Sequence, residues 1–195
     1  TNLVKPGEEP KSWNDFLDPK WKGKILAHDP SVSMTWYNAL VPLINAGVLK
    51  VDFIRELSKQ DLRFVTGDYD AVQKLSQGQA PLVLVTADVV SGASVSEGAP
   101  IKAIPMNEGL PASTVMIGVV KDSPHPNAAK VFMNWHLSQE GQTVFHKARG
   151  TASVRKDVPD FRHPNVSVPN TVKLVIMTKE DGDQAAKQFR EKFYL

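Results

Sequence analysis

Cysteine is absent from the chain, which excludes disulfide bonds and thiolate metal sites. Long hydrophobic runs are also missing, because no stretch approaches the roughly 18 apolar residues of a membrane helix. There is no excess of charge of one sign: 23 basic residues stand against 21 acidic ones, and the formal net charge is +2. This balance argues against nucleic acid or an anionic membrane as a binding partner.

Recognisable catalytic and metal-binding motifs are lacking as well. The five histidines show neither zinc-ligand spacing nor a pairing with a carboxylate on one helix face, so structural or solvent-exposed roles are expected for them. No phosphate-binding glycine-rich loop and no nucleophile motif occurs. The dispersed aspartates suit helix caps better than an acid–base pair. We therefore expect no catalytic residue, no metal site and no cofactor.

The chain has the size and composition of a globular protein. Its 195 residues are enough to bury a sizeable core, and 42% of them are hydrophobic. Residues 1–11 are rich in proline and glutamate and are typical of a linker or loop. Ser12-Trp13-Asn14-Asp15 then matches a capping box and predicts a helix start.

Strand-like and helix-like segments alternate along the first half of the chain. The hydrophobic pattern predicts strands over residues 24–28, 62–65, 81–85, 101–105 and 114–120. It predicts helices over residues 34–46, 51–59 and 68–77, and a short one that ends near residues 97–98. This order indicates an α/β fold with a mixed, largely parallel sheet flanked by helices.

The second half of the chain is predicted to be mainly helical. A helix opens at Ser123-Pro124 with an apolar stripe, and another runs over residues 142–149 and is closed by Gly150. Residues 151–171 show little periodicity and are expected to be irregular. Residues 173–177 form either a short strand or a helix start, and a closing helix is predicted over residues 183–193.

Hydroxyl side chains follow the first predicted strand. Ser31, Ser33, Met34 and Thr35 stand between this strand and the next helix, where free backbone N–H groups and the helix dipole favour an anion. The alternative is that Ser31 or Ser33 only caps the helix, and the spacing alone favours capping.

Two further places carry polar side chains at strand ends. Thr86 and Asp88 follow the apolar strand 81–85, where Asp88 either pairs with a cationic or hydroxylated ligand or caps a helix. Glu108 in Asn107-Glu108-Gly109 either faces a cleft or belongs to a surface turn, which is the default for such a sequence.

Three stretches carry a resemblance to a known family. They are PKSWNDFLDPKWKGK at residues 10–24, the segment from Glu108-Gly109 to IGVVK at 117–121, and SPHPNAAKVFMNW at 123–135 with SQEGQ at 138–142. The chain resembles the iron(III)-type branch of ABC-transporter solute-binding proteins, which have the type 2 periplasmic-binding fold. The resemblance implies a non-catalytic, exported periplasmic protein that holds a small molecule or ion between two lobes and delivers it to an ABC permease in the membrane.

The resemblance also predicts how the chain is divided. Residues 1–110 are similar to the second lobe with an N-terminal linker, residues 111–165 to a segment that returns to the first lobe, and residues 166–195 to the closing helix of the second lobe. The first lobe is largely missing. We therefore expect this chain to be part of a longer protein and to supply one wall of the cleft.

The family's binding positions carry over onto specific residues. Its Ser-Gly-Thr-like loop matches Ser33-Met34-Thr35, with methionine in place of a small residue. Iron-binding members have a tyrosine pair where this chain has about Asp88 and Val89. Valine cannot bind ferric iron, so iron binding by a tyrosine pair is not expected. A small organic or phosphorylated anion, a polyamine-like cation and a sugar-like ligand remain open.

Two other classes of protein compete with this interpretation. The effector-binding domain of a cytoplasmic transcription regulator can share the fold and would follow a DNA-binding helix-turn-helix, whereas an exported protein would follow a signal peptide. An enzyme on a similar two-lobed fold would need a nucleophile or a cofactor-attachment residue.

Overall fold

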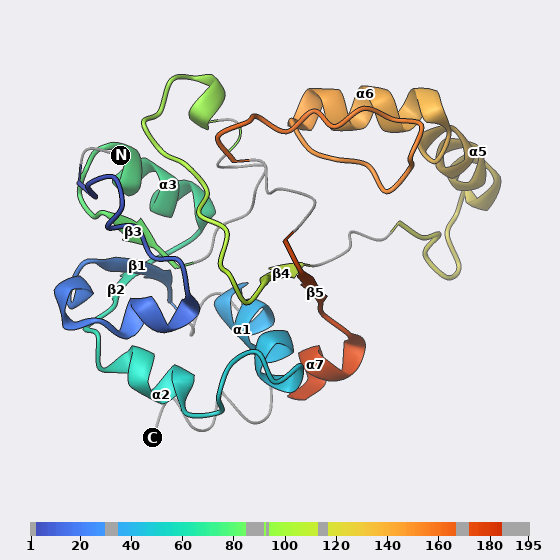
Figure 1. The fold of residues 1–195 in the computed structure, drawn as a ribbon. Helices are drawn as coiled ribbons and strands as arrows, with labels where there is room; N and C mark the ends of the chain where they lie inside the picture. Colours follow the sequence, from blue (N-terminus) through green and yellow to red (C-terminus); the bar gives the residue numbers. More distant parts are fainter. Residues whose placement is uncertain are drawn as a thin grey trace.

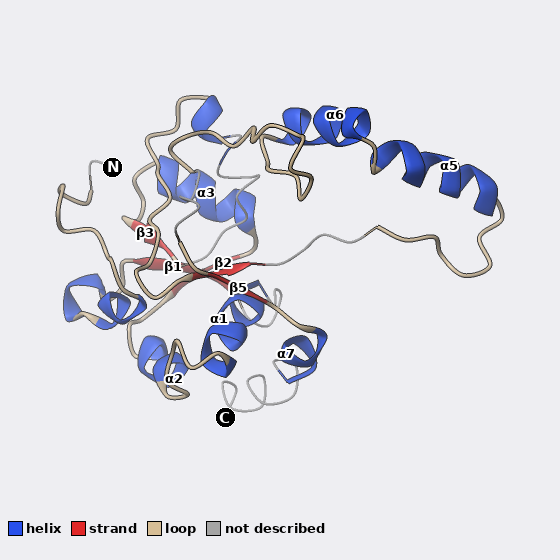
Figure 2. Cartoon of the chain, turned by 45° about the vertical axis from the view of Figure 1, so that its right-hand side comes forward, coloured by secondary structure: helices blue, strands red, loops and turns tan. Residues whose placement is uncertain are grey.

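The computed structural model describes residues 3–29, 35–84, 92, 94–112, 117–166 and 172–184 (Figure 1). Helices and parallel strands alternate through the first part of the chain, which confirms the predicted α/β class. The described residues also include an arm of two helices that projects from the body of the molecule, as Figures 1 and 2 both show.

A three-stranded parallel sheet lies at the centre of the body. β1 (Ile25–His28) is the middle strand, and it pairs with β2 (Arg63–Val65) on one side and with β3 (Leu82–Val83) on the other. All four residues of β1 are buried, as expected for a strand that is covered on both faces. The connecting helices are α1 (Thr35–Asn45), α2 (Phe53–Ser58) and α3 (Asp68–Ser76).

The side chains of β1 alternate between two cores. Ile25 and Ala27 belong to the larger core, which also contains residues of α1 and α2. Leu26 points to the opposite face and packs with Ala71 of α3. Figure 2 shows α3 on one side of the strands and α1 and α2 on the other. Because successive strand residues face opposite sides, His28 shares the α3 face with Leu26.

The predicted capping box at Ser12 is confirmed. Its hydroxyl accepts a hydrogen bond from the backbone N–H of Asn14, and the Asp15 carboxylate accepts one from the backbone N–H of Ser12. The element that it caps is a short 3-10 helix, η1 (Trp13–Leu17), followed by η2 (Pro19–Trp21).

A second, two-stranded sheet lies beside α1. β4 (Leu110–Ala112) and β5 (Leu174–Ile176) pair in parallel, although residues 113–173 separate them in the sequence. Residues 173–177 therefore form the strand of the two predicted alternatives. The closing helix α7 (Lys179–Gln184) begins four residues before the predicted start at Asp183, and its predicted continuation to residue 193 lies outside the described residues.

Two predicted strands are wrong where the structure describes them. Residues 101–105 and 117–120 have sequences typical of strands but form none. The start of the second predicted strand, at residues 114–116, lies outside the described residues. A strand requires a partner, and the backbone N–H of Ala103 bonds instead to the carbonyl of Asn165. β4 forms over Leu110–Ala112 because β5 lies alongside it.

The projecting arm consists of α5 (Pro126–His136) and α6 (Gln139–Arg149). α5 begins at Pro126, three residues after the predicted opening at Ser123, and proline suits this first position. Gly150 ends α6 in the left-handed conformation with φ 62°, as its sequence position predicts. The predicted apolar stripe of α5 lies in the described helix, yet none of the residues of α5 is buried.

Candidate ligand-binding edge

The carboxyl ends of the three parallel strands meet at one edge of the sheet. His28 at the end of β1 pairs with Val65 at the end of β2, and the backbone N–H of Asp29 extends the ladder to the Val65 carbonyl at 3.0 Å. On the other side, the backbone N–H of Leu84 bonds to the carbonyl of Leu26 at 2.9 Å. In open parallel sheets this edge is the usual place for ligands.

The two helices that begin at this edge differ in charge. The first turn of α1, which starts at Thr35, contains no acidic residue. The first turn of α3 contains Asp68 and Asp70. Carboxylates offset the positive end of a helix dipole, whereas an uncompensated start favours an anion. Within the described helices of this edge, the start of α1 is therefore the better anion site.

Asp70, one of the two acidic residues at the start of α3, is hydrogen-bonded to residues on either side of it in the sequence. Asp70 accepts from the backbone N–H of Thr66 at 3.1 Å and from the Lys74 ammonium at 3.0 Å. The hydrogen bond from Lys74, followed by that from Thr66, holds the pKa of Asp70 below its usual value. The turn that leads from β2 into α3 is thus fixed by its own side chains.

A buried imidazole lies directly beneath the edge. His28 is only 1% exposed, and its Nε2 is 3.2 Å from Oδ1 of Asp68. The two groups are close without the alignment of a hydrogen bond. Nδ1 of His28 has no hydrogen-bond partner in the described structure. The sequence interpretation did not single out His28; the one available signal was a histidine at the end of an otherwise apolar strand.

The structure tests only part of the predicted site. Thr35 is the first residue of α1 and is partly exposed at the edge. Ser33, Met34, Thr86 and Asp88 lie outside the described residues, so their roles stay predictions.

Glu108 is held by the N-terminal segment. Its Oε1 accepts a hydrogen bond from the Ser12 hydroxyl, and the neighbouring carbonyl of Gly109 accepts one from the Trp13 indole at 2.9 Å. Its second oxygen, Oε2, is buried and has no hydrogen-bond partner in the described structure. Glu108 therefore has a structural contact that its sequence did not reveal, and its predicted contact with a ligand stays a prediction.

The described residues contain no group of three or more histidine, cysteine, aspartate or glutamate residues arranged to hold a metal ion. Within the same ranges, no helix combines the length and hydrophobicity required to cross a membrane.

The parallel strands of the described residues, and their likeness to solved periplasmic binding proteins, show the type 2 periplasmic-binding fold. The model of one family, described as bacterial extracellular solute-binding protein, matches residues 1–166. The chain belongs to this family.

Individual relatives are more distant. An uncharacterized protein of Haemophilus influenzae is 26% identical over 171 residues, which are 86% of this chain and 49% of that protein. The periplasmic binding protein AfuA from Actinobacillus pleuropneumoniae, solved with fructose 6-phosphate bound, has a TM-score of 0.76 at 19% identity and aligns with 96% of this chain. A Bordetella ferric binding protein has a TM-score of 0.65 at 19% identity and aligns with 94% of this chain.

The chain is shorter than these relatives. It spans 49% of the Haemophilus protein, 61% of the AfuA chain and 62% of the Bordetella chain.

Proposed function

We propose that this chain is part of the substrate-binding component of an ABC importer, which binds a small solute outside the cytoplasmic membrane and presents it to a membrane permease. The proposal rests chiefly on one observation: three parallel strands end together beside the start of α1, where no acidic residue offsets the helix dipole. Membership of the solute-binding family supports it. The protein acts by binding and closure, without chemical conversion of its ligand.

The proposed ligand is a small anion that also carries hydroxyl groups. The start of α1 favours the anionic group, and the predicted contacts from Ser33, Thr35 and Thr86 suit oxygen-rich ligands. Asp88 and Glu108 would accept hydrogen bonds from ligand hydroxyls. Fructose 6-phosphate, bound by the AfuA structure, belongs to this class of compound and is the natural first probe.

A thermal-shift and calorimetry screen of the complete polypeptide tests this function. The compounds are fructose 6-phosphate, inorganic phosphate, citrate, spermidine and glucose. We expect a sugar phosphate or another hydroxylated anion to raise the melting temperature, because a ligand that prefers the folded state stabilises it. Alanine substitutions at Ser33 and Asp88 should weaken binding and leave the protein folded. A response to spermidine alone, or to none of the five, contradicts the proposal.

Iron binding through a pair of tyrosines is not part of the proposed function. The chain has three tyrosines, and none lies near Asp88 and Val89, where the resemblance places such a pair. Ferric iron prefers hard anionic oxygen ligands, which valine does not offer. Titration with ferric iron should therefore produce no tyrosinate charge-transfer absorption, and a strong visible band would contradict this part of the proposal.

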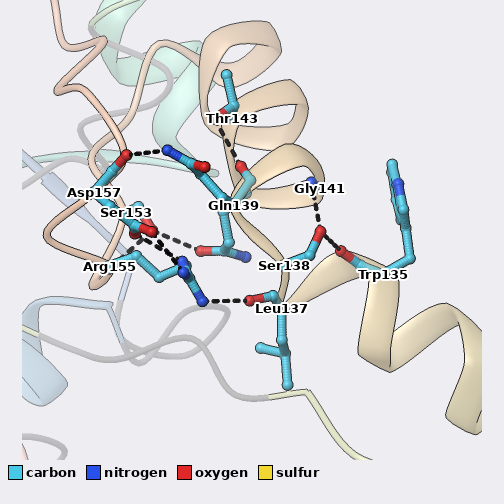
Figure 3. Close-up of polar contacts among 10 residues, drawn as sticks. Trp135, Leu137, Ser138, Gln139, Gly141, Thr143, Ser153, Arg155 and Asp157 are labelled. Carbon is cyan, nitrogen blue, oxygen red and sulfur yellow. Dashed lines mark hydrogen bonds and ion pairs between the residues drawn. The ribbon is translucent and has the colours of Figure 1, made fainter.

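We further propose that residues 111–165 return to the first lobe and pack against it, with residues 1–110 and 166–195 forming the second lobe. Polar contacts fix the α5–α6 arm (Figure 3). Arg155 donates from Nη1 to the carbonyl of Leu137 at 3.1 Å and pairs with Asp157 at 2.6 Å. The Gln139 amide donates to the carbonyl of Asp157 at 2.9 Å, so the segment after α6 is fastened across the junction of the two helices.

The junction itself is closely packed. The Ser138 hydroxyl donates to the carbonyl of Trp135 at 2.6 Å and accepts from the backbone N–H of Gly141 at 3.1 Å. A side chain at position 141 would collide with the backbone of Trp135 and would come within 2.9 Å of Cα of His136. The angle between α5 and α6 is therefore fixed without the help of a hydrophobic core.

This two-helix arm presents apolar side chains to solvent. Its large, exposed hydrophobic residues, with exposed fractions of 40–69%, are Val131, Phe132, Trp135, Leu137 and Val144. Burial of such side chains is worth roughly 1.5–3 kcal/mol each. A preformed apolar surface of this kind is suited to packing against another folded unit, and the part of the relatives that this chain does not span offers one.

A further inference from the structure

We propose that His28 and Asp68 are positioning residues of the ligand-binding edge: their contact fixes the start of α3 relative to the end of β1, and thereby shapes the wall that receives the ligand. This inference rests on the proposed function. It assigns a role to a buried histidine and to a carboxylate that the sequence interpretation did not connect.

The contact lies where the two site-forming segments diverge. His28 is the last residue of β1, and Asp68 is the first residue of α3, which follows β2 after the two-residue turn 66–67. The strands are in register at this level, since His28 lies opposite Val65. The His28–Asp68 contact at 3.2 Å therefore joins the two chain segments just as they leave the sheet.

Apolar packing already holds the rest of α3 in place. Leu26, Val65, Ala71 and Ala80 form a small core between the helix and the sheet, and each is at least 98% buried. The helix can therefore stay attached to the sheet without the polar contact. What the contact adds is a hold on Asp68 itself, the first residue of α3, which lies three residues before Ala71 and outside the apolar core.

The burial of the pair makes its geometry restrictive. The His28 side chain is 2% exposed and the Asp68 side chain 25% exposed, so the carboxylate reaches from the edge into the interior. Electrostatic contacts are stronger in such surroundings than in water. Asp70 on the same turn is engaged by Lys74 and Thr66, so it is not available to replace Asp68.

A set of variants of the complete polypeptide tests this role. His28→Asn shortens the side chain and removes the group that approaches Asp68, whereas His28→Gln places an amide N–H about where the imidazole has Nε2. Asp68→Ala removes the carboxylate, and the double variant combines His28→Asn with Asp68→Ala. Asp52→Ala is the matched control, because Asp52 also lies at the start of a helix but pairs with Arg55 in solvent, with both side chains more than 60% exposed.

Calorimetric titration with fructose 6-phosphate gives the first readout. We expect His28→Asn and Asp68→Ala each to weaken binding about tenfold, and the double variant to bind no more weakly than either, because both changes remove one contact. His28→Gln should recover affinity to within about threefold of the wild type, and Asp52→Ala should match it. Equal affinities in all variants, or fully additive losses, would overturn the positioning role. If His28→Asn does not fold, Asp68→Ala and its comparison with Asp52→Ala decide the question.

Amide hydrogen exchange without any ligand gives the second readout. In Asp68→Ala, exchange should accelerate at Asp29 and Ala71, whose N–H groups bond to the Val65 and Gly67 carbonyls at 3.0 Å. It should stay unchanged at Leu84 within the sheet. The inference would be overturned if exchange accelerated equally at all three amides, or if it accelerated at none of them. If wild-type protein does not bind fructose 6-phosphate, the proposed ligand class is wrong, while the exchange pattern still decides whether the pair positions the edge.

Discussion

At the residue scale, two buried tryptophans differ in whether the indole N–H has a hydrogen-bond partner. Trp13 is 2% exposed, and its indole N–H donates to the carbonyl of Gly109 at 2.9 Å, which ties the N-terminal segment to the start of β4. Trp21 is 5% exposed, and its indole nitrogen has no hydrogen-bond partner in the described structure. A buried donor without a partner costs free energy, whereas a paired one contributes to stability.

The same substitution at both positions should therefore give different results. Trp13→Phe leaves the Gly109 carbonyl without its partner, while Trp21→Phe removes an unpaired donor along with a similar area of ring. We expect Trp13→Phe to lower the free energy of unfolding by about 1–3 kcal/mol more than Trp21→Phe. Urea denaturation of the two variants measures the difference, and equal losses would contradict the assigned role of the indole contact.

Residue-level contacts were the least predictable part of the molecule. The capping box at Ser12 was predicted because its partners are close in sequence. The bond from Ser12 to Glu108 and the contact of His28 with Asp68 join residues that are far apart in the chain, and no local pattern signals them. For that reason the sequence alone predicts only a cleft or a turn for Glu108, and only a general structural or solvent-exposed role for His28.

At the element scale, the attachment of α7 depends on one aspartate. Asp181 is 7% exposed; its carboxylate accepts from the backbone N–H of Thr178 at 2.6 Å and from the amide of Asn45, at the end of α1, at 2.5 Å. Burial raises the pKa of Asp181, but the hydrogen bonds from Thr178 and Asn45 outweigh it and leave the pKa below its usual value. The charged carboxylate thus links α7 to α1.

Substitution of Asp181 should weaken this link. Asp181→Asn replaces one acceptor by a donor, and we expect it to lower the free energy of unfolding by about 1–3 kcal/mol at pH 7. Because the folded pKa is lowered, the contribution of Asp181 is present above its unfolded pKa of about 4 and is lost as the pH falls below that value. Wild-type stability should therefore decrease more than that of Asp181→Asn between pH 5 and pH 3. Asp183→Asn, at an exposed position of the same helix, is the control, and identical pH profiles would contradict the prediction.

Elements with strong local signals were predictable, and elements that depend on distant partners were not. α1 and α3 follow their apolar spacing and terminal glycines closely, whereas α6 ends before Gly150 as predicted but begins at Gln139, three residues before its predicted start at residue 142. The predicted strand 101–105 lacks a partner, and β4 exists because β5 arrives from far along the chain. Periodicity reports which residues suit a strand, but pairing decides whether the strand forms.

At the scale of the whole molecule, the exposed apolar residues of the α5–α6 arm test the proposed packing of residues 111–165 against the first lobe. Phe132 is 54% exposed and stacks on the His136 ring with 5.6 Å between centroids. If the first lobe covers this residue, Phe132→Ser should lower the free energy of unfolding of a polypeptide that contains both lobes by about 2–3 kcal/mol. In the 195-residue chain the same change should cost less than about 1 kcal/mol, since half of the ring is already in water.

Lys130 offers a matched control on the same helix. It is exposed and lies on the side of α5 opposite to Phe132, so Lys130→Ser should have little effect in either form of the protein. Equal effects of Phe132→Ser in the 195-residue chain and in a polypeptide that contains both lobes, measured by chemical denaturation, would contradict the proposed packing against the first lobe.

The central claim is that a small ligand binds at the carboxyl edge of the parallel sheet. Chemical-shift mapping by NMR, with isotope-labelled complete polypeptide and added fructose 6-phosphate, tests it most directly. If the ligand binds there, the largest chemical-shift changes should occur at Asp29, Thr35 and Asp68, around the ends of β1 and β2. Shifts concentrated instead at the opposite end of the sheet, in the groove lined by residues 75–78 and 100–102, would contradict it.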